Sequence, residues 1–595
     1  MSIKSYPNVK VRTFEVQDGS LHMGLVVTCK YNPLVHSPKV TLIAEYEGKT
    51  RFLPVLVQSY FQNVDLETCT IVAEYTYDIN SLFIFPVKDS PVEFFISLLY
   101  GDDYTEKCNL TVDGDIRSDE QFCALSSCND KNGLFIKRKA PYSKPHKNPV
   151  LRALRWLISN VYYLFVRLFG LILVPFLILD AFMAYFGLKE GGYVSSETRT
   201  PLRFFVDYLR VGFKAITREE IGRKDLKEKL AIFLSNRYKK EPVVQNRVTF
   251  ISNRRSDLNG NLEDIYNVLK DNKDVEIQML FDDHPMHRMS MKNIAKFAKL
   301  YATSAVVIID DFYELTSIVP KKDEVKLVQV WHACGAFKTF GFSRLGKPGG
   351  PRQTCINHRM YDRAIVSSDE IRRFYAEGFG IPIANVIATG VPRTDMFFSD
   401  EIKRRKQEEF YEKYPSLRDK KIILFSPTFR GNGRLTGNYP MENFDLESVY
   451  EAIGDEYAIL VKMHPFVNNP VIIPEKYKAS IIDFSADSEL NDLLFVTDIL
   501  ITDYSSVVFE ASLLGIPMLF YAFDLSEYIA TRDFYYEYAS FLPGKLELSL
   551  DGVIKAINSG DFESEKIEAF RNRFFDERDG KSSQRVADMI LGLLK

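Results

Sequence analysis

Two histidines in the C-terminal half of the chain each follow an apolar run that is typical of a buried strand. His332 lies in VQVWHACGAFK (328–338), and His464 lies in ILVKMHPF (459–466), where Pro465 stops the strand from continuing. An imidazole titrates near neutral pH, so a histidine beside a substrate cleft can act as a general base. A histidine with a purely structural role is the alternative for each. The pattern therefore predicts His332 and His464 as candidate catalytic residues.

A third strand end carries hydroxyl groups. In DILITDYSSVVFEASLLGIPMLFY (498–521), Ser505 and Ser506 open a predicted helix just after Asp503. Free N–H groups at a helix start bind anions such as phosphate, and the helix dipole reinforces them. Capping of the helix by Asp503 or Ser505 is the alternative. Because several strand ends share this chemistry, we expect a phosphate-binding site here.

A fourth strand end, in FSPTFR (425–430), carries Thr428 and Arg430. An arginine can hold a phosphate through two parallel hydrogen bonds. A surface arginine in a turn is the alternative.

The elements that must position these residues form two successive series of strands and helices, at 245–400 and 415–595, joined by a charged helix and linker at 400–421. This alternation is typical of parallel α/β sheets and predicts two Rossmann-like domains that face a cleft. In such sheets ligands bind outside the carboxyl ends of the strands. The predicted fold class is therefore α/β, with the candidate residues at the edges of two sheets.

The N-terminal part of the chain has a different pattern. Short runs rich in Val, Thr, Tyr and Phe predict a β-sandwich domain at 1–120. Residues 131–240 form a basic and apolar segment that predicts membrane-associating helices, with its most apolar part at 156–188. Arg167, Asp180 and Pro175 interrupt that part, so we expect a monotopic anchor rather than a spanning helix. A buried helical hairpin is the alternative.

Composition excludes several functions. The net charge of −3 does not favour nucleic acid as a partner, and the seven scattered cysteines form no CxxC pair. The chain contains no Walker A sequence and no GxGxxG after its first α/β strand, which argues against ATP-dependent phosphoryl transfer and dinucleotide chemistry. FDDHPMH (281–287) has no strong metal-ligand spacing, so no metal site is predicted. The N-terminus lacks the apolar region of a secretory signal.

Seven ordered motifs resemble the CDP-glycerol glycerophosphotransferase family, the teichoic acid primases and polymerases of Gram-positive cell walls. The match runs in order over roughly residues 245–595. The motifs read WHACGAFKTFGFS (331–343), ATGVPRTDMFF (388–398), ILFSPTFR (423–430), VKMHP (461–465), ITDYSSVVFEAS (501–512), RDFYYEY (532–538) and DGKSSQRV (579–586). The resemblance implies a GT-B fold and transfer of polyol phosphate from a CDP-polyol to the terminal hydroxyl of a lipid-linked teichoic acid chain, with release of CMP.

The resemblance also implies residue roles. His332 matches the base that acts on the acceptor hydroxyl, and His464 matches a histidine near the donor diphosphate. The implied donor- and phosphate-binding residues are Thr428, Arg430, Ser505, Ser506 and, in an orienting role, Asp503. The implied orienting residues are Lys338, Arg393 and Asp395.

The first motif departs from the WHGT-P-L-K form of many members. Its longer WHACGAFK form looks closer to the ribitol-phosphate polymerases, so CDP-ribitol is the favoured donor and CDP-glycerol the alternative. We expect a peripheral protein on the cytoplasmic face of the cell membrane. A homo-oligomer and assistance by Mg²⁺ are left open.

Three other functions remain alternatives. A GT-B glycosyltransferase would use a nucleotide sugar, a primase would add one unit and stop, and a scaffold would consume no donor.

Overall fold

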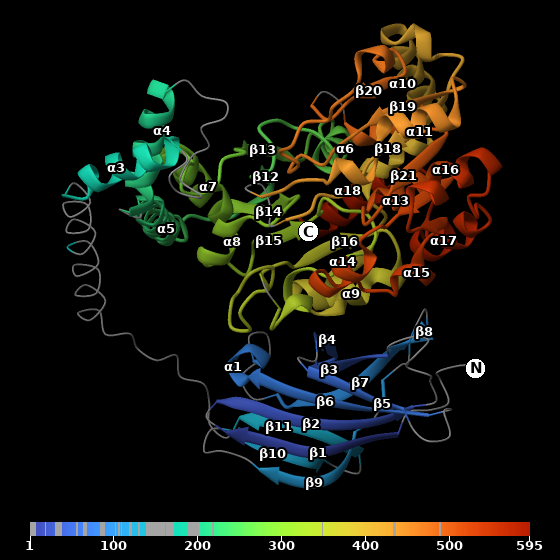
Figure 1. The fold of residues 1–595 in the computed structure, drawn as a ribbon. Helices are drawn as coiled ribbons and strands as arrows, with labels where there is room; N and C mark the ends of the chain where they lie inside the picture. Colours follow the sequence, from blue (N-terminus) through green and yellow to red (C-terminus); the bar gives the residue numbers. More distant parts are fainter. Residues whose placement is uncertain are drawn as a thin grey trace.

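The computed structural model describes residues 8–17, 19–29, 38–54, 57–62, 68–83, 90–100, 103–104, 107–108, 110–117, 122–128, 131–138, 161, 172–186, 201–216, 219–347, 349–431, 436–486 and 489–594. These residues form an N-terminal β-sandwich, a helical arm and two α/β domains. Figure 1 shows the sandwich below the α/β domains and the arm projecting to one side.

The sandwich consists of two sheets whose strands alternate buried and exposed side chains. One sheet has the order β5 (Val57–Gln62), β6 (Cys69–Asp78), β2 (Ser20–Cys29), β1 (Asn8–Gln17), β9 (Thr111–Arg117). The other has the order β10 (Phe122–Cys128), β11 (Lys131–Arg138), β7 (Val92–Tyr100), β3 (Lys39–Tyr46), β4 (Lys49–Pro54), and β8 (Asp103–Tyr104) pairs with β7. The inward-facing side chains of both sheets form one apolar core. A short helix, α1 (Ile79–Leu82), follows β6.

The sandwich extends further than the sequence indicated. Residues 131–138, assigned by sequence to the helical segment, form β11 and pair with β7 in antiparallel register. Leu134 and Ile136 of β11 are fully buried in the sandwich core. The sequence assignment followed the basic residues of this stretch and missed the buried apolar residues within it.

The arm comprises α3 (Val174–Tyr185), α4 (Pro201–Ile216) and α5 (Glu219–Tyr238). α3 and α4 pack together through Ala181, Phe204 and Tyr208. The Tyr208 hydroxyl donates to Asp180 (2.7 Å), which satisfies the acidic residue that interrupts the apolar segment. Within the described ranges, no helix is long and apolar enough to cross a membrane. Most of the predicted segment 156–188 before Ile172 lies outside the described residues.

The first α/β domain has a six-stranded parallel sheet. Its order is β13 (Glu276–Phe281), β12 (Val244–Ser252), β14 (Ser304–Ile309), β15 (Lys326–Gln329), β16 (Arg363–Val366), β17 (Val386–Ala388). Its helices are α6 (Asn261–Leu269), α7 (Met291–Thr303), α8 (Glu314–Ile318) and α9 (Arg372–Phe379). All six strands match runs predicted from the sequence.

The second α/β domain follows α10 (Asp400–Lys413), the charged helix between the two series. Its parallel sheet has the order β20 (Ile481–Asp483), β19 (Tyr457–Val461), β18 (Lys421–Phe425), β21 (Ile499–Thr502), β22 (Met518–Tyr521), β23 (Lys545–Glu547). Its helices are α11 (Leu446–Ile453), α12 (Leu490–Leu494), α13 (Val507–Leu514), α14 (Leu525–Thr531), α15 (Tyr538–Phe541), α16 (Leu550–Ser559) and α17 (Lys566–Phe574). The expectation of two parallel α/β units is confirmed, and β23 is an addition.

The last helix, α18 (Ser582–Leu593), returns to the first α/β domain. Val586, Ala587 and Ile590 are buried against strands β12 and β14 of that domain. Asp395 fixes the start of α18, because its carboxylate accepts hydrogen bonds from the N–H groups of residues 582 and 583 (2.9 and 2.7 Å). The second α/β domain, predicted at 415–595, therefore ends before α18, because the chain returns to the first domain at that helix.

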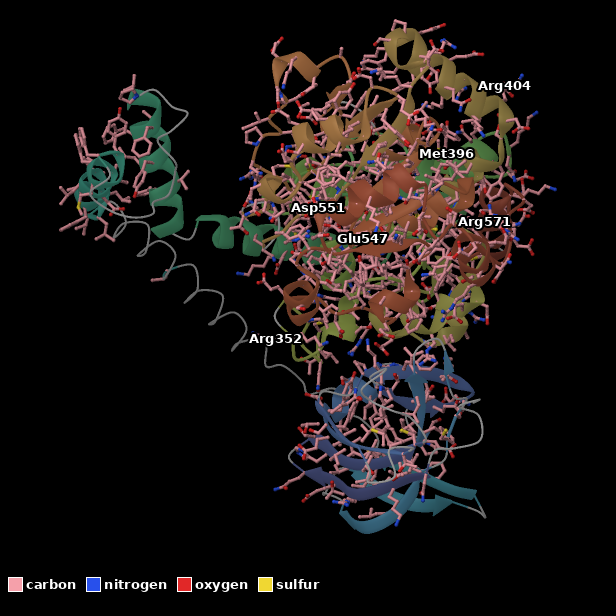
Figure 2. All side chains as sticks on the ribbon, turned by 45° about the vertical axis from the view of Figure 1, so that its right-hand side comes forward. Arg352, Met396, Arg404, Glu547, Asp551 and Arg571 are labelled. Atoms are coloured by element: carbon pink, nitrogen blue, oxygen red, sulfur yellow. The ribbon has the colours of Figure 1, made fainter. Side chains whose placement is uncertain are left out.

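The sandwich docks on the first α/β domain. The Gln353 amide donates to the Thr76 carbonyl (2.8 Å), and buried Arg359 donates to the Tyr77 hydroxyl (3.2 Å). Arg352, labelled in Figure 2, marks this junction between the two parts. The sandwich is thus fixed to segments that lie just downstream of the His332 loop.

Candidate active site

Three strand ends of the first α/β domain bring charged side chains to His332. β12 ends shortly before Arg254 and Arg255, and β14 ends at the residue before Asp310 and Asp311. Arg254 pairs with Asp311 (3.2 Å), and Arg255 pairs with Asp310 (2.9 Å). Nδ1 of His332 lies 3.3 Å from the same Asp311 oxygen. Because β12, β14 and β15 are neighbours in the sheet, these groups gather at its carboxyl edge.

The loop that carries His332 is held in an unusual conformation. Trp331 has φ of +51°, in the left-handed region that a bulky residue seldom adopts. Donors from three other elements hold the carbonyl oxygens of the loop at 2.7–3.3 Å: Asn261 at residues 330 and 331, Arg393 at 332, and Tyr375 at 333 and 335. Such strain persists only where the surroundings over-determine it, and it clusters at functional sites.

His332 is kept neutral by its surroundings. Burial first, and then the cations of Arg254, Arg393 and Arg255, lower the pKa of His332 well below its usual value. Nδ1 of His332 is buried and has no hydrogen-bond partner among the described residues, so its contact with Asp311 is a charge proximity and not a hydrogen bond. A proton on Nδ1 would face the Asp311 carboxylate and would leave the lone pair on Nε2. His332 therefore has the protonation state that a general base requires.

His464 has the opposite tautomer. Its Nδ1 accepts a hydrogen bond from the N–H of Phe466 (3.1 Å), so the proton of the neutral ring lies on Nε2. Burial, Lys338 and Arg254 lower the pKa of His464 to about 4. Arg254 and Lys338 come from the first α/β domain, so the two domains meet at this histidine. A neutral His464 with Nε2–H can donate a hydrogen bond to a phosphate oxygen.

Lys338 links the His332 loop to the second α/β domain. It forms a β-bridge with Phe534, and the flanking N–H groups of Thr339 and Tyr535 bond across to the carbonyls of Asp533 and Phe337 (2.9 Å each). We call residues 533–535 the strap. Burial lowers the pKa of Lys338 to about 8. The Asp503 carboxylate opposes this shift, and the cations of Arg532 and Arg430 add to it.

Arg430 is occupied by the protein itself. Its Nε and Nη2 donate to Asp524 (2.6 and 2.9 Å), and its Nη1 donates to Asp503 and to the Thr428 carbonyl (2.9 and 2.6 Å). The predicted bidentate contact of Arg430 with phosphate is therefore corrected, because no pair of its nitrogens is left for a second anion. Asp503 in turn accepts from the N–H groups of Thr428 (2.7 Å) and Tyr504 (2.6 Å). Arg430 and Asp503 thus shape the loop that carries Thr428, which is itself buried.

The start of α13 carries the two predicted serines. Ser505 Oγ accepts from the N–H of Val507 (3.3 Å), so this hydroxyl caps the helix. Ser506 occupies the cap position without a side-chain cap hydrogen bond, and both serines are partly exposed. The Ser506 hydroxyl and the first N–H groups of α13 fit an anion. The structure does not bring Asp395 into this group, since its carboxylate is used by α18.

Several residues of this site escaped the sequence analysis. They are Arg254, Arg255, Asn261, Asp310, Asp311, Glu510 and Asp524. Paired charges directly after strands, as in NRRSD (253–257) and DD (310–311), were the available signal.

One group could hold a metal ion among the residues that the structure describes. Ligand atoms of Asp282, Asp283 and His284 lie within 4.8 Å of one another. Asp282 already bonds His284 (2.8 Å) and Asn293 (2.7 Å). The group follows the edge strand β13, which β12 and β14 separate from β15.

Comparisons with known proteins identify the family and the relatives of this chain. A family model described as CDP-glycerol:poly(glycerophosphate) glycerophosphotransferase matches residues 233–592. The teichoic acid poly(ribitol-phosphate) polymerase of Bacillus spizizenii is 47% identical over 59% of this chain and 57% of its own length. The ribitol-phosphate polymerase TarL of Staphylococcus aureus is 42% identical over 58% of this chain and 62% of its own length. The chain thus spans about 60% of these two relatives.

Two further comparisons are with a primase, most of whose length the match covers, and with a solved structure. A teichoic acid ribitol-phosphate primase of Bacillus spizizenii is 36% identical over 59% of this chain and 92% of its own length. The solved structure of the wall teichoic acid polymerase TagF superposes with a TM-score of 0.53 at 23% identity, over 64% of this chain and 97% of that one. This likeness supports a GT-B-like fold. Relatives named for glycerol phosphate are 29–33% identical, against 36–47% for those named for ribitol phosphate.

Proposed function

Because this chain belongs to the CDP-glycerol:poly(glycerophosphate) glycerophosphotransferase family, we propose that it is a teichoic acid polymerase. It transfers a polyol phosphate, with ribitol phosphate favoured, from a CDP-polyol to the terminal hydroxyl of a lipid-linked teichoic acid chain. The CMP half of the donor is released. The residue pattern of the first motif and the higher identity to proteins named for ribitol phosphate support the choice of donor.

The observation that carries the proposal is the neutral His332 at the meeting point of the two α/β domains. Its Nε2 lone pair takes the proton of the acceptor hydroxyl as the oxygen attacks the β-phosphorus of the donor. The bond from that phosphorus to the bridging oxygen breaks, and the electron pair leaves with CMP. A base positioned in this way contributes about 10²–10⁴-fold in rate.

Groups of both α/β domains stabilise the charge that develops on the diphosphate. His464 donates through Nε2–H, the Ser506 hydroxyl and the start of α13 supply neutral donors, and Lys338 supplies a cation. Preorganised donors of this kind are the main source of catalysis in phosphoryl transfer. Arg430 acts indirectly, by holding the Thr428 loop in place.

The test is release of CMP by the purified protein with a lipid-linked primer and either CDP-ribitol or CDP-glycerol. We expect release with CDP-ribitol and a ladder of long products. Release only with CDP-glycerol would replace the donor, and release only from a UDP-sugar, as UDP, would replace the reaction. The same assay with EDTA and with added Mg²⁺ measures whether a divalent cation assists.

A chain-initiating primase is the second candidate. The match to the ribitol-phosphate primase covers 92% of that protein, whereas the match to the polymerase covers 57%. A single added unit per primer, rather than a ladder, would establish the primase.

We also propose that the arm binds the cytoplasmic face of the cell membrane. Helix α3 exposes several large apolar side chains, of which Phe176 is 66% and Leu179 is 60% exposed. Leu202 and Val206 of α4 are also exposed (78% and 56%). Helices α3 and α4 stand clear of the α/β domains in both views (Figures 1 and 2), whereas α5 packs against α7 of the first domain. Apolar helices of this kind bind at the headgroup boundary, which would bring a lipid-linked acceptor to the enzyme.

Sedimentation with anionic phospholipid vesicles tests this placement. Replacing Phe176 and Leu179 by serine is expected to reduce vesicle binding by at least about tenfold, because each buried apolar side chain contributes about 1.5–3 kcal/mol. Replacing Ile472, a 79% exposed residue of the second α/β domain, by serine is the matched control. Binding that survives the double replacement would contradict the anchor.

A further inference from the structure

A buried ion pair crosses the boundary between the two α/β domains directly beneath His332. Arg393 of the first domain forms an ion pair through Nη2 with Glu510 of helix α13 in the second. The side chains of Arg393 and Glu510 are 20% and 3% exposed. The same guanidinium donates through Nη1 to the His332 carbonyl (2.7 Å). One side chain thus joins the backbone of the proposed base to the helix proposed to receive the donor diphosphate.

The two domains also touch closely beside this pair. Gly335 of the His332 loop has φ of +67°, and a Cβ there would lie 2.2 Å from the ring of Phe509, the neighbour of Glu510. Phe509 therefore packs on bare backbone of the loop. A shift of α13 relative to the first domain would disturb both the ring contact and the ion pair.

The ion pair is poorly explained as a device for stability. Glu510 Oε2 and Arg393 Nε are buried atoms without a hydrogen-bond partner in the described part of the chain. Burying two charges costs several kcal/mol per ion, and well-packed apolar side chains often stabilise a fold as well or better. An apolar pair in the same place would not fix the geometry of the His332 loop or the charge beside it.

The pair also sets the charge around His332. The charged groups facing this imidazole are Arg254 and Arg255 after β12, Asp311 after β14, and Arg393, while the Asp310 carboxylate pairs with Arg255. Glu510 offsets the Arg393 cation without touching the imidazole. Loss of the Glu510 charge would strengthen the effect of Arg393 on His332, whereas loss of Arg393 would remove it.

We propose that Glu510 is a positioning residue that couples helix α13 to the backbone and the protonation of His332. The role rests on the proposed function, since it requires His332 to act as the base. In this role, the donor-side helix and the base keep one relative position while the acceptor hydroxyl attacks.

The test compares Glu510→Gln with Arg393→Met in CMP release from CDP-ribitol with a lipid-linked primer. Both variants are expected to lower kcat about 10–100-fold with KM for the donor within about threefold, because a small misplacement of a reacting group can cost about 10²-fold. The acid limb of the pH–rate profile is expected to move to lower pH in Glu510→Gln and to higher pH in Arg393→Met. A purely structural pair would not move the two limbs in opposite directions.

Two further variants keep the outcome clear. Glu568→Gln removes a 54% exposed acidic partner of Arg571, which Figure 2 labels, and is expected to match the wild type. Arg393→Met with Glu510→Leu removes both charges, and we expect it to keep the thermal unfolding temperature within a few degrees while kcat stays low. Wild-type kcat in the folded double variant, or unmoved acid limbs in the single variants, would overturn the role of Glu510. An inactive wild type would overturn the proposed function itself, and this role with it.

Discussion

The two strand-end histidines occupy similar places in the two sheets but are held in different ways. His332 lies in a loop whose backbone is strained at Trp331 and whose carbonyls are held by side chains from elsewhere in the chain. His464 lies in a short turn that its own neighbours complete. Phe466 donates to its ring, and Phe429 packs on it at 4.7 Å between ring centroids.

This difference determines what each ring can do. We expect the Asp311 carboxylate beside Nδ1 to favour the proton there and to leave the lone pair of His332 on Nε2. The N–H of Phe466, by contrast, leaves His464 with a proton on Nε2. Both rings are neutral at pH 7, because burial and neighbouring cations lower the pKa of each. One ring is thus suited to accept a proton and the other to donate a hydrogen bond.

The largest effect is expected at His332. His332→Ala removes the only proposed base, so kcat for CMP release should fall by about 10²–10⁴-fold. His332→Asn should be equally slow, since an amide has no basic lone pair. Circular dichroism and thermal unfolding check that both variants fold. A folded His332→Asn protein with more than a tenth of the wild-type kcat would contradict the role of base.

A smaller effect is expected at His464. His464→Ala removes one hydrogen bond to a charged group, which is worth about 1.5–3 kcal/mol, so kcat/KM for the donor should fall about 10–100-fold. His464→Asn retains an N–H donor and should recover part of that loss. Equal losses in the alanine and asparagine variants at this position would remove the distinction between the two histidines.

The pH dependence on the alkaline side is expected to follow Lys338. Its ammonium is present below its pKa of about 8 and is lost as pH rises through that value, so activity that needs the cation should decline above pH 8. Lys338→Arg keeps a charge at all these pH values, and its profile should stay flat to about pH 10. A wild-type profile that is level from pH 7 to 10 would show that the Lys338 charge is not required.

The sequence was sufficient for elements that local pattern determines. Apolar runs located every strand of the two sheets except β23, whose first and last residues are both charged. The same runs located His332 and His464, because a polar residue after a buried strand is itself a local signal. Arg393, for which the resemblance implies an orienting role, donates to the His332 carbonyl, and that role stays a prediction.

Features that depend on distant parts of the chain could not be read in the same way. Arg430 was expected to bind phosphate, but Asp524, which lies 94 residues later, takes two of its nitrogens. Asn261 reaches a loop 70 residues away, and Glu510 meets Arg393 across 117 residues. Nothing in the local pattern of these residues distinguishes such partners from solvent.

The smallest effect is expected from a contact between the sandwich and the strap that no local pattern indicates. Lys39 of the sandwich donates to the Phe534 carbonyl and lies 3.8 Å from Asp533, both in the strap that pairs with Lys338. Lys39→Met should lower kcat only about two- to fivefold, because a partly exposed charge pair contributes about 0.2–1 kcal/mol. Lys107→Met is the control. It removes an exposed lysine whose ion-pair partner, Glu45, belongs to the same sandwich domain, and it should leave kcat unchanged. A loss in Lys39→Met alone would show that the sandwich helps to hold the strap, and therefore Lys338, in place. Equal rates in both variants would reduce the sandwich to an attached domain without influence on the reaction.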